Sequence, residues 1–140
     1  MYDGVDPLSS ADESNLYFRM RPAVGSPGWV EYQFAKPTRI SSTAAYWVDD
    51  RRFCKPPESW RILYKNGDKW EPVVARGAYG VNKNAFNRVE FEPVTTTAVR
   101  LEVEPKTVHY KTGEIGPPAA MFLDGPVDWR EFGIIEWRVR

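Results

Sequence analysis

Seven short segments with the composition of β-strands, separated by turn-forming residues, constrain the fold of this chain most strongly. In the clearest segment Val30, Tyr32 and Phe34 alternate with Glu31 and Gln33, which gives a strand one apolar and one polar face. Strands of this length and spacing are typical of an antiparallel β-sandwich or barrel. The seven segments cover residues 29–34, 39–48, 60–64, 70–74, 87–91, 98–103 and 133–139.

Turn chemistry supports an all-β fold. The 140 residues include 12 Pro and 10 Gly, which leaves little room for long helices. Asn66-Gly67 lies between the third and fourth segments, and this dipeptide is the strongest short hairpin signal. Lys36-Pro37 is predicted to end the first segment. The connections after the second, fourth and sixth segments are long, and long connections are often functional.

Length and charge limit the classes of protein to consider. At 140 residues and 16.1 kDa, residues 1–140 are expected to form a single domain. The 19 Lys+Arg balance the 19 Asp+Glu. Proteins that bind nucleic acids or anionic membranes usually carry an excess of basic residues, so the balanced charge argues against both as the main partner. No apolar run reaches the ~20 residues of a membrane span, and Met1–Gly4 shows no targeting signal. The single Cys54 cannot form an internal disulfide.

The residue types predict no catalysis. His109 is the only histidine, and it has no nucleophile near it in the sequence. There is no glycine-rich phosphate loop, and one Cys with one His excludes an ordinary zinc site. A glycosidase needs two carboxylates about 5–10 Å apart, and several loop carboxylates leave that alternative open.

The loop after the second segment is the first candidate binding site. It carries Asp49, Asp50, Arg51 and Arg52, followed by Phe53. Carboxylates and guanidinium groups can bind vicinal hydroxyls, and an aromatic face can contact a sugar ring. A solvated loop of ion pairs explains the same residues, so composition alone leaves both interpretations open.

Aromatic residues outside the strand pattern extend this candidate site. Tyr79, Phe122 and Trp129 lie in loops, and Trp47 borders the acidic and basic loop. Loop aromatics either cover the ends of a core or form a binding platform. Four further tryptophans lie within strand segments and are expected to pack in the core: Trp29, Trp60, Trp70 and Trp137.

The N-terminal residues are a candidate calcium site. Asp3 and Asp6 precede Ser9 and Ser10, so that hard oxygen donors follow one another on a turn-forming backbone, as Ca²⁺ prefers. Asp-Gly is equally a common turn sequence, and the spacing alone does not distinguish the two.

Taken together, these segments resemble the galactose-binding-like family, which comprises the discoidin (coagulation factor type C) domains and their carbohydrate-binding-module relatives. The family has W-[IV]-x-[FYV]-D-[FL]-G-x-P where this chain has residues 29–37. The chain is similar, more narrowly, to C-terminal modules of bacterial glycoside hydrolases of the Bacteroidetes type. The other matching pieces are Asp3-Gly4 and residues 56–64, 93–103 and 133–139.

The resemblance implies an antiparallel jelly-roll β-sandwich that serves as a non-catalytic carbohydrate-binding module. It implies sugar contacts from Arg51 or Arg52, from a polar residue between positions 79 and 87, and from Phe122 or Trp129. It also implies a structural calcium ion held by Asp3 or Asp6 together with Glu136. The family has a strand before Asp-Gly, and whether this chain lacks that first strand stays open.

The expected partners follow from the same resemblance. They are a plant or host polysaccharide and a neighbouring catalytic domain, in a periplasmic or extracellular parent protein from which residues 1–140 were excised. One alternative is a structural domain that packs on the catalytic domain and binds no sugar. Binding of lipid headgroups or proteins by the loops is disfavoured, because exposed apolar loop residues are not evident.

Overall fold

The computed structural model describes residues 6–12, 17–111 and 127–140. The described residues form antiparallel β-strands and no helix, as the sequence predicts. Accordingly, this part of the chain contains no helix long and apolar enough to span a membrane. The strands are β1 (Phe18–Met20), β2 (Gly28–Trp47), β3 (Ser59–Asn66), β4 (Lys69–Pro72), β5 (Phe86–Glu104), β6 (Thr107–Tyr110), β7 (Val127–Arg130) and β8 (Phe132–Val139).

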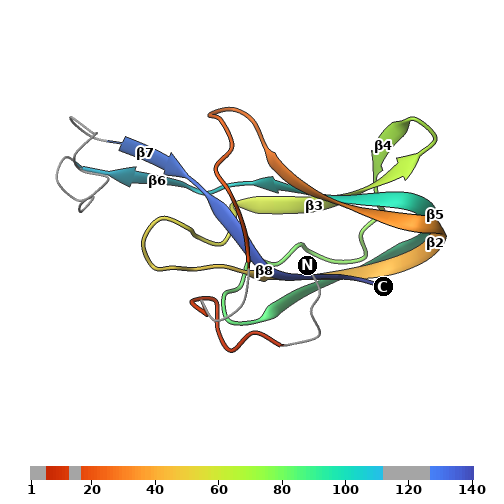
Figure 1. The fold of residues 1–140 in the computed structure, drawn as a ribbon, viewed down its shortest axis with the longest axis horizontal. Coiled ribbons are helices and arrows are strands. Elements are labelled where there is room, and N and C mark those ends of the chain that lie inside the picture. Colours follow the sequence, from red (N-terminus) through yellow and green to blue (C-terminus); the bar gives the residue numbers. More distant parts are fainter. Residues whose placement is uncertain (1–5, 13–16, 112–126) are drawn as a thin grey trace.

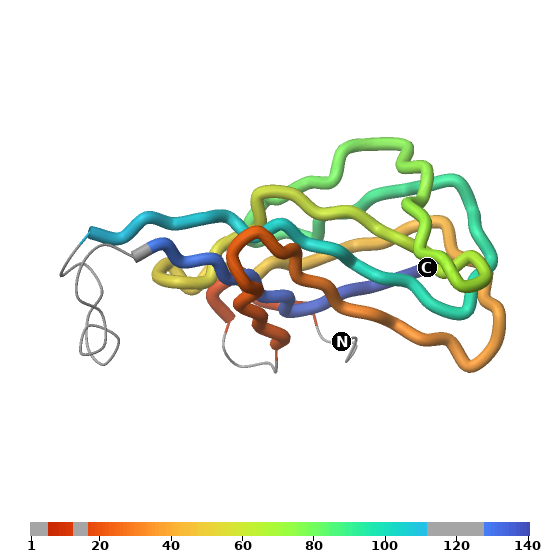
Figure 2. Tube along the Cα trace, turned by 90° about the horizontal axis from the view of Figure 1, so that it is seen from above, coloured from red at the N-terminus to blue at the C-terminus, as the bar shows by residue number. Residues whose placement is uncertain are grey.

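One bent sheet makes both layers of the sandwich. Its strand order is β1-β8-β2-β5-β3-β4, and β2 pairs with β5 along almost the whole length of both strands. Figure 1 shows β2 and β5 turning back together at one end of the molecule, and Figure 2 shows the same bend from above. The first half of β2 lies in the layer with β3 and β4, and its second half lies beside β8.

The bend arises at two irregularities of opposite sense. Between the pairs Gln33↔Ala98 and Thr38↔Thr96, β2 has three more residues than β5, and Pro37 lies in this excess. A second register shift follows, in which β5 carries the excess and contains Pro93. Proline fits such positions because it donates no ladder hydrogen bond. The prediction that Lys36-Pro37 ends a strand is therefore wrong.

The core lies between the two layers. The ring of Trp47 meets that of Trp60 edge-on, with centroids 5.4 Å apart. Trp60 and Trp137 are buried, as predicted. Other buried members include Ile40, Ile62, Val89, Phe91, Leu101, Val103, Phe132 and Ile134.

Two tryptophans predicted in the core lie outside it. Trp29 is 46% exposed, because strand alternation places it on the same face as Glu31. The guanidinium carbon of Arg100 lies 4.2 Å from the ring centroids of both Trp29 and Trp70. Cation–π contacts therefore hold these rings on the outer face of the sheet, and the core prediction for them is wrong.

A smaller apolar cluster fixes the loop that follows β2. Val48 and Cys54 pack with Tyr46 and Ile135 on the other side of the β2–β8 layer. A Cβ on Gly133 would lie 2.8 Å from a methyl carbon of Val48 and 3.0 Å from the Cys54 sulfur. Glycine is therefore required at position 133 for the loop to approach β8 this closely.

A two-stranded ribbon projects from the end of the sandwich that lies opposite the bend. The strands β6 and β7 pair antiparallel from Thr107↔Arg130 to Tyr110↔Val127, and Figure 1 shows them projecting beyond the sandwich. The loop between β2 and β3 lies at the same end, so the ribbon and this loop together form the end of the molecule where the candidate site is found.

Candidate functional site

Asp50 shapes the loop between β2 and β3. Its Oδ1 accepts hydrogen bonds from the backbone N–H groups of Arg52 at 2.8 Å and of Phe53 and Cys54 at 2.9 Å. Its Oδ2 accepts a bond of 2.8 Å from Arg19. Burial raises the pKa of Asp50, but these backbone bonds and the charge of Arg19 outweigh it, so the pKa is lowered. Both oxygens are engaged, which indicates a structural role.

Asp49 faces a cleft beside this loop. The residue is only 8% exposed, and its Oδ1 accepts the backbone N–H of Arg51 at 2.8 Å. The ammonium nitrogen of Lys55 lies 3.7 Å from Oδ1, and that of Lys83 lies 3.6 Å from Oδ2. Asp49 is therefore a fixed carboxylate between two cations that come from different loops.

The cleft has a volume of about 480 Å³. We call it the loop-end cleft, because its walls are the loops that follow β2, β4 and β5. Three lysines and two acids contribute to its lining, so it presents both hydrogen-bond donors and acceptors beside apolar proline and valine side chains. The lining residues are Asp49, Lys55, Pro56, Pro57, Glu58, Val81, Asn82, Lys83 and Lys106.

Hydrogen bonds hold the wall that carries Asn82 and Lys83. The Asn87 amide accepts the N–H of Asn82 at 2.8 Å and donates to the Asn82 carbonyl at 2.8 Å. The next turn is tied to the N-terminal segment, since Ser10 and Asn84 exchange two bonds of 2.8 and 2.7 Å. The wall is therefore organised without a ligand, which lowers the entropic cost of binding.

An aromatic cluster lies along the ribbon where the loop after β2 packs against it, and it consists of Phe53, Tyr110 and Trp129. The Phe53 ring centroid lies 4.8 Å from that of Trp129 and 5.8 Å from that of Tyr110. The guanidinium carbon of Arg21 lies 3.6 Å from the Trp129 ring, whose Nε1 donates to Glu131 at 2.8 Å. Arg21 therefore covers part of the Trp129 ring that stacking on a sugar would need.

The structure separates the predicted site residues. Trp47 is 0% exposed, so the prediction that it contacts a sugar is wrong: its side chain lies on the inner face of β2. Tyr79 packs edge-on against Trp60, with centroids 4.8 Å apart, and its hydroxyl accepts the Ile62 N–H at 3.3 Å. Burial accordingly raises the pKa of Tyr79. Tyr79 thus covers the core, and it is absent from the cleft lining.

The remaining predicted residues that the structure describes lie at or near the same end. Asp49 lines the cleft, and Arg51 and Arg52 are exposed on its loop. Arg51 adopts a φ of 63°, a left-handed conformation uncommon for a residue with a Cβ. Sugar contacts of these three residues and of Trp129 stay predictions. Phe122 lies outside the described residues.

The sequence interpretation missed the lysines of the cleft. Lys55, Lys83 and Lys106 lie in three different connections, and only the folded sheet brings these connections together. The available signal was the length of those connections and the polar stretch between positions 79 and 87, which contains Asn82 and Lys83.

The proposed calcium ligands flank an arginine. Glu136 is 2% exposed, and its Oε1 accepts a bond of 2.6 Å from Arg138 Nε. Asp6 pairs with the same guanidinium group. Among the described residues the buried Oε2 of Glu136 has no hydrogen-bond partner, and no three acidic, His or Cys side chains form a metal-binding group there. Asp3 lies outside the described residues.

The sequence matches no family model, and no curated protein matches it. A chain of the Streptococcus pneumoniae β-galactosidase BgaA superposes with a TM-score of 0.63 and 14% identity, covering 98% of this chain and 80% of that one.

Two solved carbohydrate-binding modules are also similar. Chitosan-binding module 1 of the chitosanase/glucanase from Paenibacillus sp. IK-5 has a TM-score of 0.56 and 14% identity, covering 99% of this chain and 80% of its own. The CBM32 of AlyQ in complex with 4,5-unsaturated mannuronic acid has a TM-score of 0.56 and 12% identity, covering 94% and 83%. The chain therefore has the antiparallel, galactose-binding-like β-sandwich fold of these modules, as the sequence predicted.

Proposed function

We propose that this chain is a non-catalytic carbohydrate-binding module and that its glycan binds in the loop-end cleft. The observation that carries the proposal is the fixed carboxylate of Asp49, which faces the cleft between Lys55 and Lys83. The fold supports it, since two of the similar structures are described as binding chitosan and as holding an unsaturated mannuronic acid.

The cleft offers the groups that sugar hydroxyls need. A carboxylate accepts hydrogen bonds from two vicinal hydroxyls, and the ammonium groups of Lys55 and Lys83 donate to hydroxyl oxygens. The amide of Asn82 can do both. At about 480 Å³ the cleft is in the size range of small-ligand sites. The described residues that line the cleft include no aromatic side chain, which favours recognition of hydroxyl patterns over stacking.

The proposal places the domain beside a catalytic partner. The plant or host polysaccharides that we expect as ligands lie outside the bacterial cytoplasm, so we infer a periplasmic or extracellular parent protein, with a glycan-degrading enzyme in the same polypeptide. Weak binding by a single cleft is sufficient there, because tethering raises the effective concentration of the enzyme at its substrate.

We also propose a structural calcium ion at Glu136. The support is the buried Oε2 of Glu136, which has no hydrogen-bond partner among the described residues. Burial of a carboxylate oxygen without a partner costs free energy, and a hard cation such as Ca²⁺ would supply that partner. Asp6 is the second candidate ligand among the described residues, with Asp3 beyond them. The guanidinium of Arg138 already pairs with Glu136 and Asp6, so a bound ion would have to share these carboxylates with it or displace it.

Calorimetric titration tests the carbohydrate proposal. The folded protein is titrated with chito-oligosaccharides, oligogalacturonates, mannuronate oligomers and neutral galactans. The Asp49→Asn variant keeps an oxygen for the Arg51 N–H but loses the charge, so glycan affinity should fall about tenfold. Asp68→Asn, in the exposed hairpin turn after β3, is the matched control and should bind normally. A flat response of the folded wild type to all four glycans would instead favour a domain that only packs on its neighbour.

A further inference from the structure

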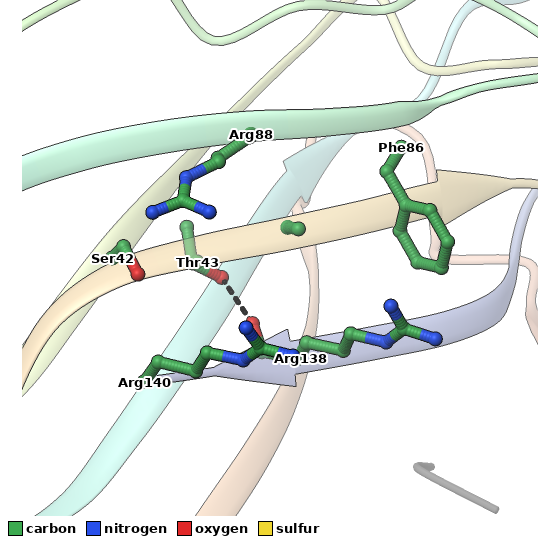
Figure 3. A pocket seen from close by; sticks show the side chains of 7 residues that line it. Ser42, Thr43, Phe86, Arg88, Arg138 and Arg140 are labelled. Carbon is green, nitrogen blue, oxygen red and sulfur yellow. Dashed lines mark hydrogen bonds between the residues drawn. The ribbon is translucent and has the colours of Figure 1, made fainter. Parts of the chain in front are cut away.

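Three arginines surround a hollow on the outer face of the sheet, away from the loop-end cleft. In the register of β5, β2 and β8, Arg88 and Arg138 lie directly across from Ala44 on either side. The small Ala44 side chain leaves a hollow of about 150 Å³ between them, to which Arg140 also contributes. Figure 3 shows the guanidinium groups of Arg88, Arg138 and Arg140 disposed around it.

The charges around the hollow are unevenly compensated. Arg138 is held by Glu136 at 2.6 Å and by Asp6. Arg88 lies 3.4 Å from Glu90, with side chains 59% and 62% exposed, and exposed pairs of this kind contribute little. Among the described residues no carboxylate lies within ion-pair distance of Arg140. The rim therefore keeps positive charge that an anionic ligand could bind.

One of these guanidinium groups is also held in position. The guanidinium carbon of Arg138 lies 4.1 Å from the Phe86 ring centroid, and its Nε is bound by the buried Glu136. Ordering of a long side chain before a ligand arrives removes part of the entropic cost of binding. A planar guanidinium is also suited to two parallel bonds with a carboxylate or sulfate.

The floor of the hollow is apolar while its rim is cationic. Ala44 and Phe86 form part of the lining, together with Ser42. A ligand that matches has an apolar C–H face next to an oxyanion. Sugars that carry a carboxylate or a sulfate group have this combination, whereas neutral sugars lack the oxyanion.

We propose that this hollow is a second glycan site, which binds the oxyanion of an acidic sugar residue through Arg88 and Arg140 beside the positioned Arg138. The inference rests on the proposed function in taking the ligand to be a glycan. It extends that function by assigning acidic polysaccharides as a ligand class and by placing their contact on the β5–β2–β8 face.

The test is titration of ¹⁵N-labelled protein with three probes: an oligogalacturonate, a sulfated oligosaccharide of similar length and a neutral galacto-oligosaccharide. The double variant R88Q/R140Q is compared with R61Q/R76Q, which removes the same charge from two exposed arginines elsewhere, each of them paired with a glutamate. The backbone amide of Ala44 reports on the hollow, and those of Asn82 and Lys83 report on the loop-end cleft.

We expect an acidic probe to shift the Ala44 signal in the wild type and in R61Q/R76Q. In R88Q/R140Q the affinity at this signal should fall about tenfold or more, because charge-assisted bonds are roughly twice as strong as neutral ones. A shift with one acidic probe alone identifies the oxyanion as carboxylate or sulfate. An unmoved Ala44 signal with both acidic probes, or equal affinity in the two double variants, overturns the inference. Unmoved Asn82 and Lys83 signals with every probe, together with no calorimetric response to chito-oligosaccharides or mannuronate oligomers, would instead contradict the proposed function.

Discussion

The carboxylate of Asp49 lies 3.6 Å from the ammonium nitrogen of Lys83, although the two residues belong to different loops. Asp49 follows the end of β2, and Lys83 precedes the start of β5. These strand ends meet because Tyr46 of β2 pairs with Phe86 of β5. The long paired strands thus bring the two walls of the cleft together, and several consequences of this arrangement can be measured.

Trp47 is a core residue and its role can be separated from sugar binding. Truncation in Trp47→Ala should lower the free energy of unfolding by about 3–5 kcal/mol, as for other buried large aromatic residues. Trp29→Ala, on the outer face, should cost much less. Urea denaturation followed by circular dichroism measures both. Near-normal stability of Trp47→Ala would contradict the packing described for β2.

Asp50 should make the stability depend on pH. Its pKa is lowered in the folded state, so its contribution is full above the unfolded-state pKa of about 4 and is lost as the pH falls through the folded-state value. Asp50→Asn should therefore destabilise the protein by about 1–3 kcal/mol near neutral pH.

Denaturation of the wild type and of Asp50→Asn between about pH 3 and pH 8 tests whether the stabilisation by Asp50 is lost as the pH falls. The difference in unfolding free energy should be constant from about pH 6 upward and should shrink below about pH 4. Asp68→Asn serves as the control in a turn without these backbone bonds. A difference that is equally large at the acidic end would show that the charge of Asp50 is not what stabilises the loop.

Cys54 should be unreactive in the folded protein. Burial raises the pKa of its thiol to about 12, and the side chain is fully buried under the loop after β2. Since the thiolate is the reactive form, labelling with a disulfide reagent near pH 8 should be at least about 100-fold slower in buffer than in denaturant. Rapid labelling of the native protein would mean that this loop opens readily.

Calcium should raise the melting temperature if Glu136 binds it. A ligand that binds only the folded state stabilises it by about 2.7 kcal/mol at a concentration 100 times its dissociation constant. The protein treated with a chelator is melted with and without added calcium, alongside Glu136→Gln and the surface control Glu102→Gln. The wild type and Glu102→Gln should respond, and Glu136→Gln should not. If neither the chelator nor added calcium changes the melting temperature of the wild type, the proposed calcium site is wrong.

The sequence predicted the local features of this fold well. The hairpin at Asn66-Gly67 is present as expected, and Gly67 has the positive φ of 64° that the turn requires. Val30 and Phe34 pack against the core as their alternation predicts, whereas Tyr32 between them is 40% exposed. These features depend on neighbouring residues only. The all-β class follows from the same local signals.

Features that depend on distant residues could not be predicted. Proline ends many strands, but here pairing with β5 resumes after Pro37 at Thr38↔Thr96, and the strand continues. The sequence around Trp47 predicts a strand with two largely apolar faces, and it does not indicate which of these faces the core. The lysine-lined cleft and the arginines around Ala44 arise from strand register, which a single sequence does not contain.

The central claim is that a glycan binds between the loops that carry Asp49 and Lys83. The most direct measurement is the set of backbone amide shifts of ¹⁵N-labelled protein on addition of a glycan that binds in calorimetry, repeated with Lys83→Gln. We expect the largest shifts at Asp49, Asn82 and Lys83, and an affinity about tenfold lower in the variant. Saturable shifts that leave these three signals unmoved, with equal affinity in the variant, would contradict it.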